Sequence, residues 1–359
     1  MKILAIAPSL NVGGIGRHLL VFAKSFAEMG HDVTYLSCIN HDEFYDPPKT
    51  INLVKPAFNN KGKLGRVFYY LRLTVYMRRL IKSIRPDFVI VFGELFNPLA
   101  LIAAKGLNIP VFIGDMTSAD YNFGKVKQFL RDLTYTWSAG LVCQTQFAEV
   151  YKKKQFGPKL NTIAIDNPIR DVIIDNNVEK EKVVLYVGRF AWEKAPDRII
   201  RAFAKIKNHQ DWRLIMCGDG PLIDENINLA SELGISNRVD FLGKVKNVDH
   251  YMSLASIYVL PSILEGFPNA LAEAMIAGLP VIVFDGFPSN EIVEDRISGI
   301  ILRNGDIDAL SKEIENLMSN PSLRQKLGEN ATEIRQRLDA KTVTKKLLEF
   351  IESSLKQKG

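Results

Sequence analysis

Two carboxylates at a spacing of eight are the residues of this chain whose types and positions best suit chemistry. Glu265 and Glu273 flank the run Gly-Phe-Pro-Asn-Ala-Leu-Ala. A carboxylate beside a phosphate would repel it, so we expect this pair to accept hydrogen bonds from sugar hydroxyl groups. The pattern therefore indicates a site for a polyhydroxylated ligand.

The residues around the pair predict a strand, a turn and a helix. Residues 257–260 form a short apolar strand, and residues 265–268 form a turn because glycine and proline are poor helix formers. Asn269 is a suitable N-cap, residues 270–277 are strong helix formers, and Gly278 is placed where a helix ends.

The N-terminus of this predicted helix is a candidate anion site. The backbone N–H groups of Ala270, Leu271 and Ala272 would have no partner inside the helix, and the macrodipole places partial positive charge there. This end of the helix could therefore bind an anionic group beside the two carboxylates.

These features resemble the E-x7-E motif of the retaining family-4 glycosyltransferases. That family has the GT-B fold, an α/β architecture of two Rossmann-like domains facing each other across a cleft. An ordinary helix start with one surface glutamate and one glutamate that complements the helix dipole is the alternative explanation.

A second segment is similar to the family's G-R-x-x-x-x-K-G motif. A predicted strand over residues 183–187 leads into Gly-Arg-Phe-Ala-Trp-Glu-Lys-Ala. The resemblance implies that Arg189 and Lys194 bind the donor diphosphate. Ala195 stands where the family has glycine. The alternative is that both cations are surface charges of a loop.

Near the N-terminus, residues 8–16 form a glycine-bearing loop between a predicted strand and a helix that begins at His18. The loop carries only part of a dinucleotide-binding fingerprint, and no acid ends the next strand, which disfavours a nicotinamide-dependent dehydrogenase. Gly13, Gly14 and Arg17 instead resemble the family's G-G-x-E-R loop, with a glycine in place of the glutamate.

Three further candidates follow predicted strands, at the strand ends where doubly wound sheets bind ligands. Asp115 follows the strand at 111–113, where many family members have a cleft-facing His or an Asp-Arg pair; alternatively, it caps the next helix. Gly218 begins a Gly-Asp-Gly turn after the strand at 213–217, and Val245 follows the next strand.

The resemblance implies a role for each matched group. Arg189, Lys194 and the backbone at 269–271 would hold the diphosphate, Glu273 the ribose hydroxyls and Glu265 those of the donor sugar. The residues expected at the donor site are Gly13, Gly14, Arg17, Arg189, Lys194, Gly218, Val245, Glu265, Phe267, Asn269, Ala270, Leu271 and Glu273. Those expected to act in catalysis are Glu265, Arg189, Lys194 and Asp115.

The length of 359 residues predicts two domains. We expect an acceptor-binding domain at 1–170, a linker at 171–182 and a nucleotide-sugar domain at 183–338. A final helix at 339–359 is expected to cross back to the N-terminal domain, as in GT-B enzymes.

The charge is divided unevenly along the chain. Residues 1–170 hold 22 Lys and Arg against 12 Asp and Glu, a net of +10; because the whole chain has 46 and 40, the remainder holds 24 and 28, a net of −4. Residues 61–85 contain eight basic residues, interleaved apolar residues and no acid. They predict either the solvated face of a core helix or a helix that binds anionic membrane lipids or a lipid diphosphate.

The composition indicates the cellular compartment and disfavours some classes of partner. Cys38, Cys143 and Cys217 are few, distant and set in apolar runs, which favours buried free thiols in a reducing cytosol. No apolar run approaches a membrane span, and the N-terminus reads as a strand rather than a signal peptide. No nucleic-acid-binding module accompanies the basic charge.

The resemblance thus implies a retaining, metal-independent glycosyltransferase without a cofactor. It would move a hexose or N-acetylhexosamine from a nucleotide sugar, with UDP favoured over GDP, to a glycan acceptor. The basic half favours a polyprenyl-diphosphate-linked acceptor at the cytoplasmic face of the membrane. A GT-B nucleotide-sugar epimerase and a non-catalytic two-lobed sugar-binding protein are the alternatives.

Overall fold

The structure is a computed structural model that describes residues 1–10, 14–40, 45, 47–58, 63–117, 123–175, 177–286 and 288–356, with backbone only at 63, 64 and 66. Gly13, a predicted site residue, lies outside the described residues. The chain forms two compact units, Met1–Arg170 with Leu338–Gly359, and Asp171–Arg337.

The first unit contains a parallel sheet of seven strands in the order β3-β2-β1-β4-β5-β6-β7. Most of these strands are apolar and buried throughout, as expected for a parallel sheet covered on both faces. Their bounds are β1 (Lys2–Ala7), β2 (Asp32–Ser37), β3 (Asn52–Val54), β4 (Phe88–Phe92), β5 (Val111–Asp115), β6 (Gly140–Cys143) and β7 (Thr162–Ala164).

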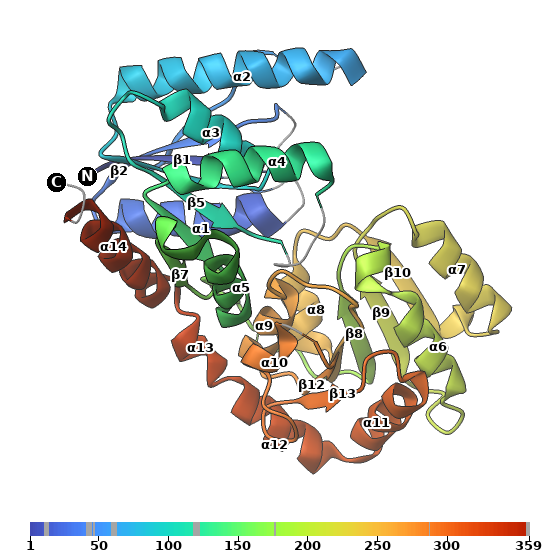
Figure 1. Cartoon of the computed structure of the whole chain (residues 1–359). Coiled ribbons are helices and arrows are strands. Elements are labelled where there is room, and N and C mark those ends of the chain that lie inside the picture. The colour runs from blue at the N-terminus through green and yellow to red at the C-terminus, as the bar shows by residue number, and fades with distance from the viewer. Residues whose placement is uncertain are drawn as a thin grey trace. The chain divides into compact units, whose positions relative to one another are not determined.

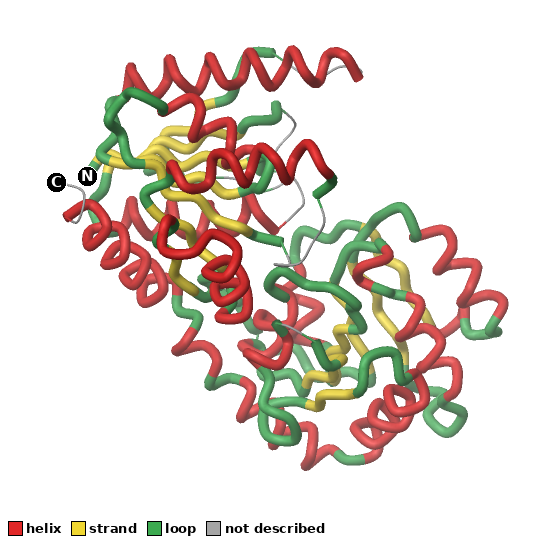
Figure 2. Tube along the Cα trace, viewed as in Figure 1, coloured by secondary structure: helices red, strands yellow, loops and turns green. Residues whose placement is uncertain are grey.

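Helices cover both faces of this sheet (Figures 1 and 2). One face packs against α1 (Gly14–Glu28) and α14 (Ala340–Lys356), whose apolar residues share a core with β1, β4 and β5. The other face packs against α2 (Lys63–Ile84), α3 (Phe96–Ala104), the short helix η1 (Tyr135–Trp137) and α5 (Gln146–Phe156). Helix α4 (Lys125–Thr134) lies next to α3 and η1.

The C-terminal helix α14 is an integral part of the first unit. The Phe350 ring packs edge-on against Phe112 at 6.0 Å, and a Cβ at Gly140 would lie 2.7 Å from the Phe350 ring. Asn161 Nδ2 also donates to Ser354 Oγ at 2.9 Å. Helix α14 therefore completes the core to which β1 contributes.

Helix α1 begins earlier than the sequence predicts. It starts at Gly14 rather than His18, so the second half of the predicted loop is its first turn. A Cβ at Gly16 would lie 1.8 Å from the Ser9 carbonyl oxygen, and Tyr35 Oη donates to the Gly16 carbonyl at 2.9 Å. This close approach leaves no space for a side chain such as the family's glutamate.

The second unit contains a parallel sheet of six strands in the order β10-β9-β8-β11-β12-β13. Its strands are β8 (Val183–Val187), β9 (Arg213–Cys217), β10 (Val239–Gly243), β11 (Ile257–Leu260), β12 (Val281–Phe284) and β13 (Ile300–Leu302). Both predicted Rossmann-like sheets are thus confirmed.

The second unit's helices alternate with its strands. They are η3 (Trp192–Lys194), α6 (Asp197–Lys205), α7 (Ile223–Glu232), η4 (Ser236–Arg238), α8 (Val248–Leu254), α9 (Asn269–Ile276), α10 (Ser289–Ile292), α11 (Ile307–Ser319), α12 (Pro321–Ala331) and α13 (Ile334–Arg337). Helices α12 and α13 are separated by only two residues.

The segment expected to be a linker is fixed along α8. The backbone N–H of Ile173 donates to Asp249 Oδ2 at 3.0 Å, and that of Asp175 to Ser253 Oγ at 3.1 Å. Lys180 Nζ donates to the Met252 carbonyl at 3.1 Å. These bonds make residues from 171 onward part of the second unit.

Candidate active site

The strand order of the second unit locates its ligand-binding edge. From β8 the chain moves outward through β9 and β10, then returns to place β11 against the other side of β8. In such sheets, ligands bind beyond the carboxyl ends of the strands at the point where the order reverses. The loops after β8 and β11 therefore form the candidate site.

Backbone hydrogen bonds join these two loops. The N–H groups of Ile263 and Leu264 both donate to the Glu193 carbonyl, at 2.8 and 3.1 Å. One loop therefore positions the other, and the side chains that follow, Lys194 and Glu265, are brought together.

Lys194 and Glu265 form an ion pair at this edge. Lys194 Nζ lies 2.5 Å from Glu265 Oε2, and Ser262 Oγ donates to Glu265 Oε1 at 2.7 Å. The Glu265 side chain is 7% exposed and that of Lys194 is 24% exposed. The carboxylate is therefore fixed from both sides, whereas the ammonium remains accessible to an anion.

Arg189 provides a second cation in the loop after β8. Its side chain is 65% exposed, and its guanidinium Nη1 lies 3.9 Å from Glu193 Oε1. A contact of this length between exposed groups is weak. Arg189 can therefore turn toward an incoming anion at little cost.

Glycines pack the loops after β8 and β9 backbone to backbone. A Cβ at Gly218 would lie 1.8 Å from the Gly188 carbonyl oxygen, and one at Gly220 would lie 2.4 Å from that of Phe190. The Gly218 N–H donates to the Gly243 carbonyl at 2.7 Å, which ties in the end of β10. Val245 follows two residues later, so Gly218 and Val245 belong to the same edge as Arg189.

Helix α9 differs from its prediction at its first turn. Asn269 is the first helical residue, and Pro268 holds the cap position without a side-chain hydrogen bond. The Ala272 N–H donates to the Pro268 carbonyl at 3.1 Å, so its N–H is not available to a ligand, contrary to the prediction. The N–H groups of Ala270 and Leu271 precede this first helical bond.

The two glutamates of the motif are both buried at this edge, together with Phe267. The charges of both act on Tyr258 of β11: burial raises the pKa of the Tyr258 phenol, and Tyr186, Glu265 and Glu273 raise it further. The phenol itself donates to the Val187 carbonyl at 3.4 Å. The two carboxylates lie on different elements, the loop after β11 and the second turn of α9.

Comparison with known proteins identifies the fold and the family. The model of "Glycosyl transferases group 1" matches residues 170–334, and that of "Glycosyltransferase Family 4" matches residues 12–184. The chain belongs to these glycosyltransferases.

Individual relatives agree with this assignment. The Campylobacter jejuni enzyme named GalNAc-alpha-(1->4)-GalNAc-alpha-(1->3)-diNAcBac-PP-undecaprenol alpha-1,4-N-acetyl-D-galactosaminyltransferase is 28% identical over 92% of this chain and 92% of its own length. The solved structure of Anabaena HepE with UDP has a TM-score of 0.80 at 21% identity, over 98% of this chain and all of HepE. Sucrose-phosphate synthase from Thermosynechococcus elongatus has a TM-score of 0.83 at 15% identity, over 99% of this chain and all of the synthase. The predicted GT-B fold is confirmed.

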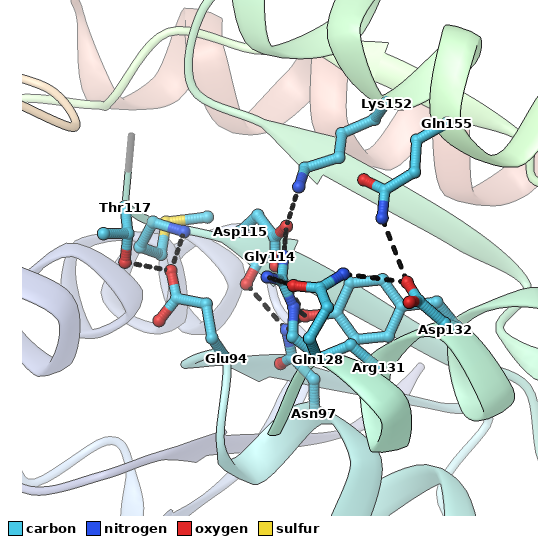
Figure 3. Close-up of polar contacts among 12 residues, drawn as sticks. Glu94, Asn97, Gly114, Asp115, Thr117, Gln128, Arg131, Asp132, Lys152 and Gln155 are labelled. Atoms are coloured by element: carbon cyan, nitrogen blue, oxygen red, sulfur yellow. Dashed lines mark hydrogen bonds and ion pairs between the residues drawn. The ribbon is translucent and has the colours of Figure 1, made fainter. Parts of the chain in front are cut away.

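In the first unit of this glycosyltransferase, Asp115 lies in a buried polar network (Figure 3). Its Oδ2 atom accepts from Arg131 Nη2 at 2.5 Å and lies 3.2 Å from Lys152 Nζ, while Oδ1 accepts from Tyr135 Oη at 2.6 Å. All four side chains are buried. Burial alone would raise the pKa of Asp115, but Arg131 and Lys152 lower it below its usual value.

This geometry bears on both expectations for Asp115. The carboxylate is the last residue of β5 and binds side chains of α4, η1 and α5 rather than capping a helix. Both of its oxygens have protein partners, so the arrangement favours a role in holding three elements together. Its predicted role in catalysis stays a prediction.

Glu94 is a residue that the sequence analysis missed. The strand order of the first unit reverses between β1 and β4, and Glu94 follows β4 by two residues. Its Oε1 atom accepts from the Met116 N–H at 2.8 Å and from the Thr117 hydroxyl. Burial raises the pKa of this carboxyl, and the charge of Asp115 raises it further. A lone acid directly after the apolar run of β4 was the available signal.

The remaining predicted residues lie at the start of α1. Gly14 is its first residue, and the Arg17 guanidinium lies over the Tyr45 ring at 5.6 Å. The loop after β1 leads to both of them. They therefore belong to the edge of the first unit at which the order of the parallel strands reverses, between β1 and β4.

Proposed function

We propose that this chain is a retaining glycosyltransferase that moves a hexose or N-acetylhexosamine from a nucleotide sugar to a lipid-linked glycan. A UDP-sugar is the favoured donor and a GDP-sugar the alternative, and the setting is cell-surface polysaccharide, O-antigen or glycolipid synthesis. The observation that carries this proposal is the Lys194–Glu265 pair at the strand-reversal edge of the second unit.

The donor would be held by charge at one end and by hydrogen bonds at the other. Arg189, Lys194 and the N–H groups of Ala270 and Leu271 would bind the diphosphate, because cations and helix N-termini stabilise developing negative charge. Glu265 would accept from hydroxyls of the transferred sugar. Glu273 would accept from the ribose.

The reaction follows from these contacts. The bond between the anomeric carbon and the diphosphate oxygen breaks, and the acceptor oxygen bonds to that carbon from the same face. The acceptor's proton passes to the departing diphosphate, so no protein nucleophile is required. Arg189 and Lys194 would neutralise the leaving group, a role that a metal ion fills in other enzymes.

The names of the relatives support a nucleotide sugar and a lipid-linked acceptor. The Campylobacter enzyme is named for an undecaprenyl-diphosphate glycan, and HepE was solved with UDP. In the first unit, Glu94 is the side chain we assign to an acceptor hydroxyl, because it lies at the strand-reversal edge with one oxygen fixed by the backbone of Met116.

The proposed location is the inner face of the cell membrane, with α2 as an electrostatic contact. Arg72, Arg79, Lys82 and Arg85 are exposed on or directly after this helix. Arg78 differs, because its Nη1 donates to the carbonyls of Ala103 and Lys105 at 2.9 and 2.8 Å and so caps α3. None of the described helices is both long and apolar enough to span a bilayer.

A thermal-shift screen with UDP-, GDP- and ADP-sugars tests the donor assignment. We expect one nucleotide to raise the melting temperature, because a ligand that binds only the folded state stabilises it. The shift should persist in excess EDTA. No shift with any nucleotide sugar would contradict the proposed function, and a shift that requires added Mg²⁺ or Mn²⁺ would contradict its metal-free form.

Product analysis of the stabilising donor then distinguishes the alternatives. A transferase releases the nucleoside diphosphate in proportion to the sugar moved to a membrane-extract acceptor. An epimerase interconverts nucleotide sugars without an acceptor, and a binding protein produces no new compound.

A further inference from the structure

Exposed apolar side chains of the first unit gather on one helical layer. Among the described residues, ten large apolar side chains are exposed on α2, α4 and α5: Val67, Phe68, Leu71, Val75, Val126, Phe129, Leu133, Phe147, Val150 and Tyr151. Of the other residues that the structure describes in this unit, only Met1, Met29, Ile102 and Trp137 are large, apolar and exposed. Such a concentration indicates a surface that another phase or molecule covers.

Helix α4 carries the clearest part of this surface. Val126, Phe129 and Leu133 recur at helical spacing and are 75%, 66% and 49% exposed. On the inner side of the same helix, Arg131 and Thr134 are buried. Helix α4 therefore exposes three large apolar side chains among its charged residues, where the solvent-facing side of a surface helix is normally polar.

Helix α5, next to α4, also exposes apolar side chains. Gln155 Nε2 of α5 donates to Asp132 Oδ1 of α4 at 3.0 Å (Figure 3). The Phe156 ring of α5 also stacks at 5.7 Å on Tyr135 of η1, which directly follows α4. Phe147, Val150 and Tyr151 are exposed on α5. Two neighbouring helices thus expose six large apolar side chains.

The charges around the stripe are basic. Lys125, Lys127, Lys153 and Lys154 are exposed on α4 and α5. The acids of these helices are already engaged: Asp132 accepts from Gln128 at 2.8 Å, and Glu149 pairs with Lys153 at 2.6 Å. Lysine next to exposed aromatic and aliphatic residues is the composition of a helix that lies in a lipid headgroup region.

The opposite layer of the same sheet provides an internal comparison. Helix α14 is also rich in lysine, but its exposed positions are all polar, including Lys345, Lys346, Glu349 and Glu352. Basic charge therefore occurs on both layers, whereas large apolar side chains are exposed on α2, α4 and α5 and not on α14. A helix face that contacts only water would be expected to carry polar side chains, as the exposed face of α14 does.

We propose that α4 and α5 insert their apolar stripe into the headgroup region of an anionic lipid bilayer. This inference rests on the membrane location given under the proposed function and adds to the electrostatic contact of α2 a hydrophobic contact made by α4 and α5. Electrostatic contacts of exposed lysine and arginine weaken with salt, but burial of apolar side chains does not. The two contributions can therefore be separated.

Co-sedimentation with phosphatidylcholine vesicles, with and without phosphatidylglycerol, tests the proposal. The wild type should bind the anionic vesicles at low salt and retain part of that binding at high salt. In the double variant Val126→Ser/Phe129→Ser, the salt-resistant part should fall about tenfold or more. Ile227→Ser/Ile297→Ser, which removes exposed apolar residues of the second unit, is the matched control and should bind like the wild type.

A second variant reports insertion directly. In Phe129→Trp, the added indole should shift its emission to shorter wavelength and be quenched by brominated lipid when anionic vesicles are present. Arg79→Glu/Lys82→Glu should remove the salt-sensitive part and leave this quenching at high lipid concentration.

The outcomes separate this inference from the one on which it rests. Wild type that ignores anionic vesicles at low salt would overturn both the membrane location and the insertion. Wild type that binds while Val126→Ser/Phe129→Ser binds equally well, with Phe129→Trp unquenched, would overturn the insertion alone. Neither result bears on nucleotide-sugar binding, which the donor screen measures.

Discussion

At the scale of single residues, the ion pair of Lys194 determines the charge of the proposed donor site. The Lys194 ammonium is neutralised by Glu265, whose other oxygen accepts from Ser262. A diphosphate would compete for the ammonium, while Glu265 would turn to the hydroxyls of the transferred sugar. The same buried carboxylate could thus bind first the Lys194 ammonium and then the hydroxyls of the sugar.

Substitution of each glutamate of the motif should weaken the binding of a different ligand. Glu273→Ala should weaken binding of free UDP about tenfold, the scale of a lost hydrogen bond to a charged group. Glu265→Ala should leave UDP binding equal or stronger, because Lys194 loses its competitor, and should weaken binding of the UDP-sugar. Titration calorimetry with both ligands measures this, and the reverse pattern would exchange the two assignments.

We expect Asp115 to contribute to the free energy of unfolding. Asp115→Asn leaves Arg131 and Lys152 buried without their anion, a change that costs about 3–5 kcal/mol. Because the folded protein lowers the pKa of Asp115, its contribution is complete above the unfolded pKa and is lost as pH falls through the folded pKa. The difference from wild type in urea unfolding should therefore shrink toward acid pH.

The matched control is Asp132→Asn, an exposed carboxylate of the same network that accepts from Gln128 and Gln155. It should cost less than about 1 kcal/mol. Full stability of Asp115→Asn together with lost transfer would instead support the catalytic role that its sequence position predicts.

Residue type and spacing singled out Arg189, Lys194, Glu265 and Glu273 as candidates, and the structure pairs Lys194 with Glu265; their roles at a donor site stay predictions. The partners of Asp115 could not be predicted, because they come from positions 131, 135 and 152 and meet only in the folded unit. Glu94 escaped notice because its position depends on strand order, which a single sequence does not contain.

At the scale of elements, the loop after β8 contains a strained residue. Ala195 has φ 42° and ψ 53°, the left-handed region in which only glycine is at ease. Its N–H donates to the carbonyls of Ala191 and Trp192, so the turn that presents Lys194 depends on this conformation. The family's glycine at this position now has a physical reason.

Ala195→Gly should therefore raise stability by about 0.5–1 kcal/mol, the relief of left-handed strain less the entropy that glycine adds to the unfolded chain. Scanning calorimetry measures the change in melting temperature. Ala191→Gly, in the same loop but extended at φ −140°, is the control and should destabilise instead. A loss at Ala195→Gly would mean that the side chain's packing outweighs its strain.

Strands and most helices were predictable because buried parallel strands are apolar throughout and the helices between them are amphipathic. Helix starts were less so. The Gly16 backbone packs against Ser9, which extends α1 to Gly14, and Pro268 rather than Asn269 occupies the cap of α9. Both differences arise from contacts between segments, whereas the cap and loop rules used for the prediction are local.

At the scale of the whole molecule, the two units share one sheet topology. A parallel sheet reverses its strand order once, between β1 and β4 in the first unit and between β8 and β11 in the second, and the candidate residues lie at those two edges. The charge differs: the basic excess belongs to residues 1–170, the part that carries the α2–α4–α5 layer. We interpret this as one unit for a nucleotide sugar and one for a lipid-linked acceptor.

The most direct test of the account is titration calorimetry of UDP, in EDTA, against wild type, Arg189→Ala/Lys194→Ala and the control Arg201→Ala, an exposed cation on α6. We predict one UDP site in the wild type and in the control, and an affinity lower by about tenfold to a hundredfold in the double variant, since charge-assisted hydrogen bonds are lost. Equal affinity in all three proteins, or a site that appears only with added metal, would contradict the account.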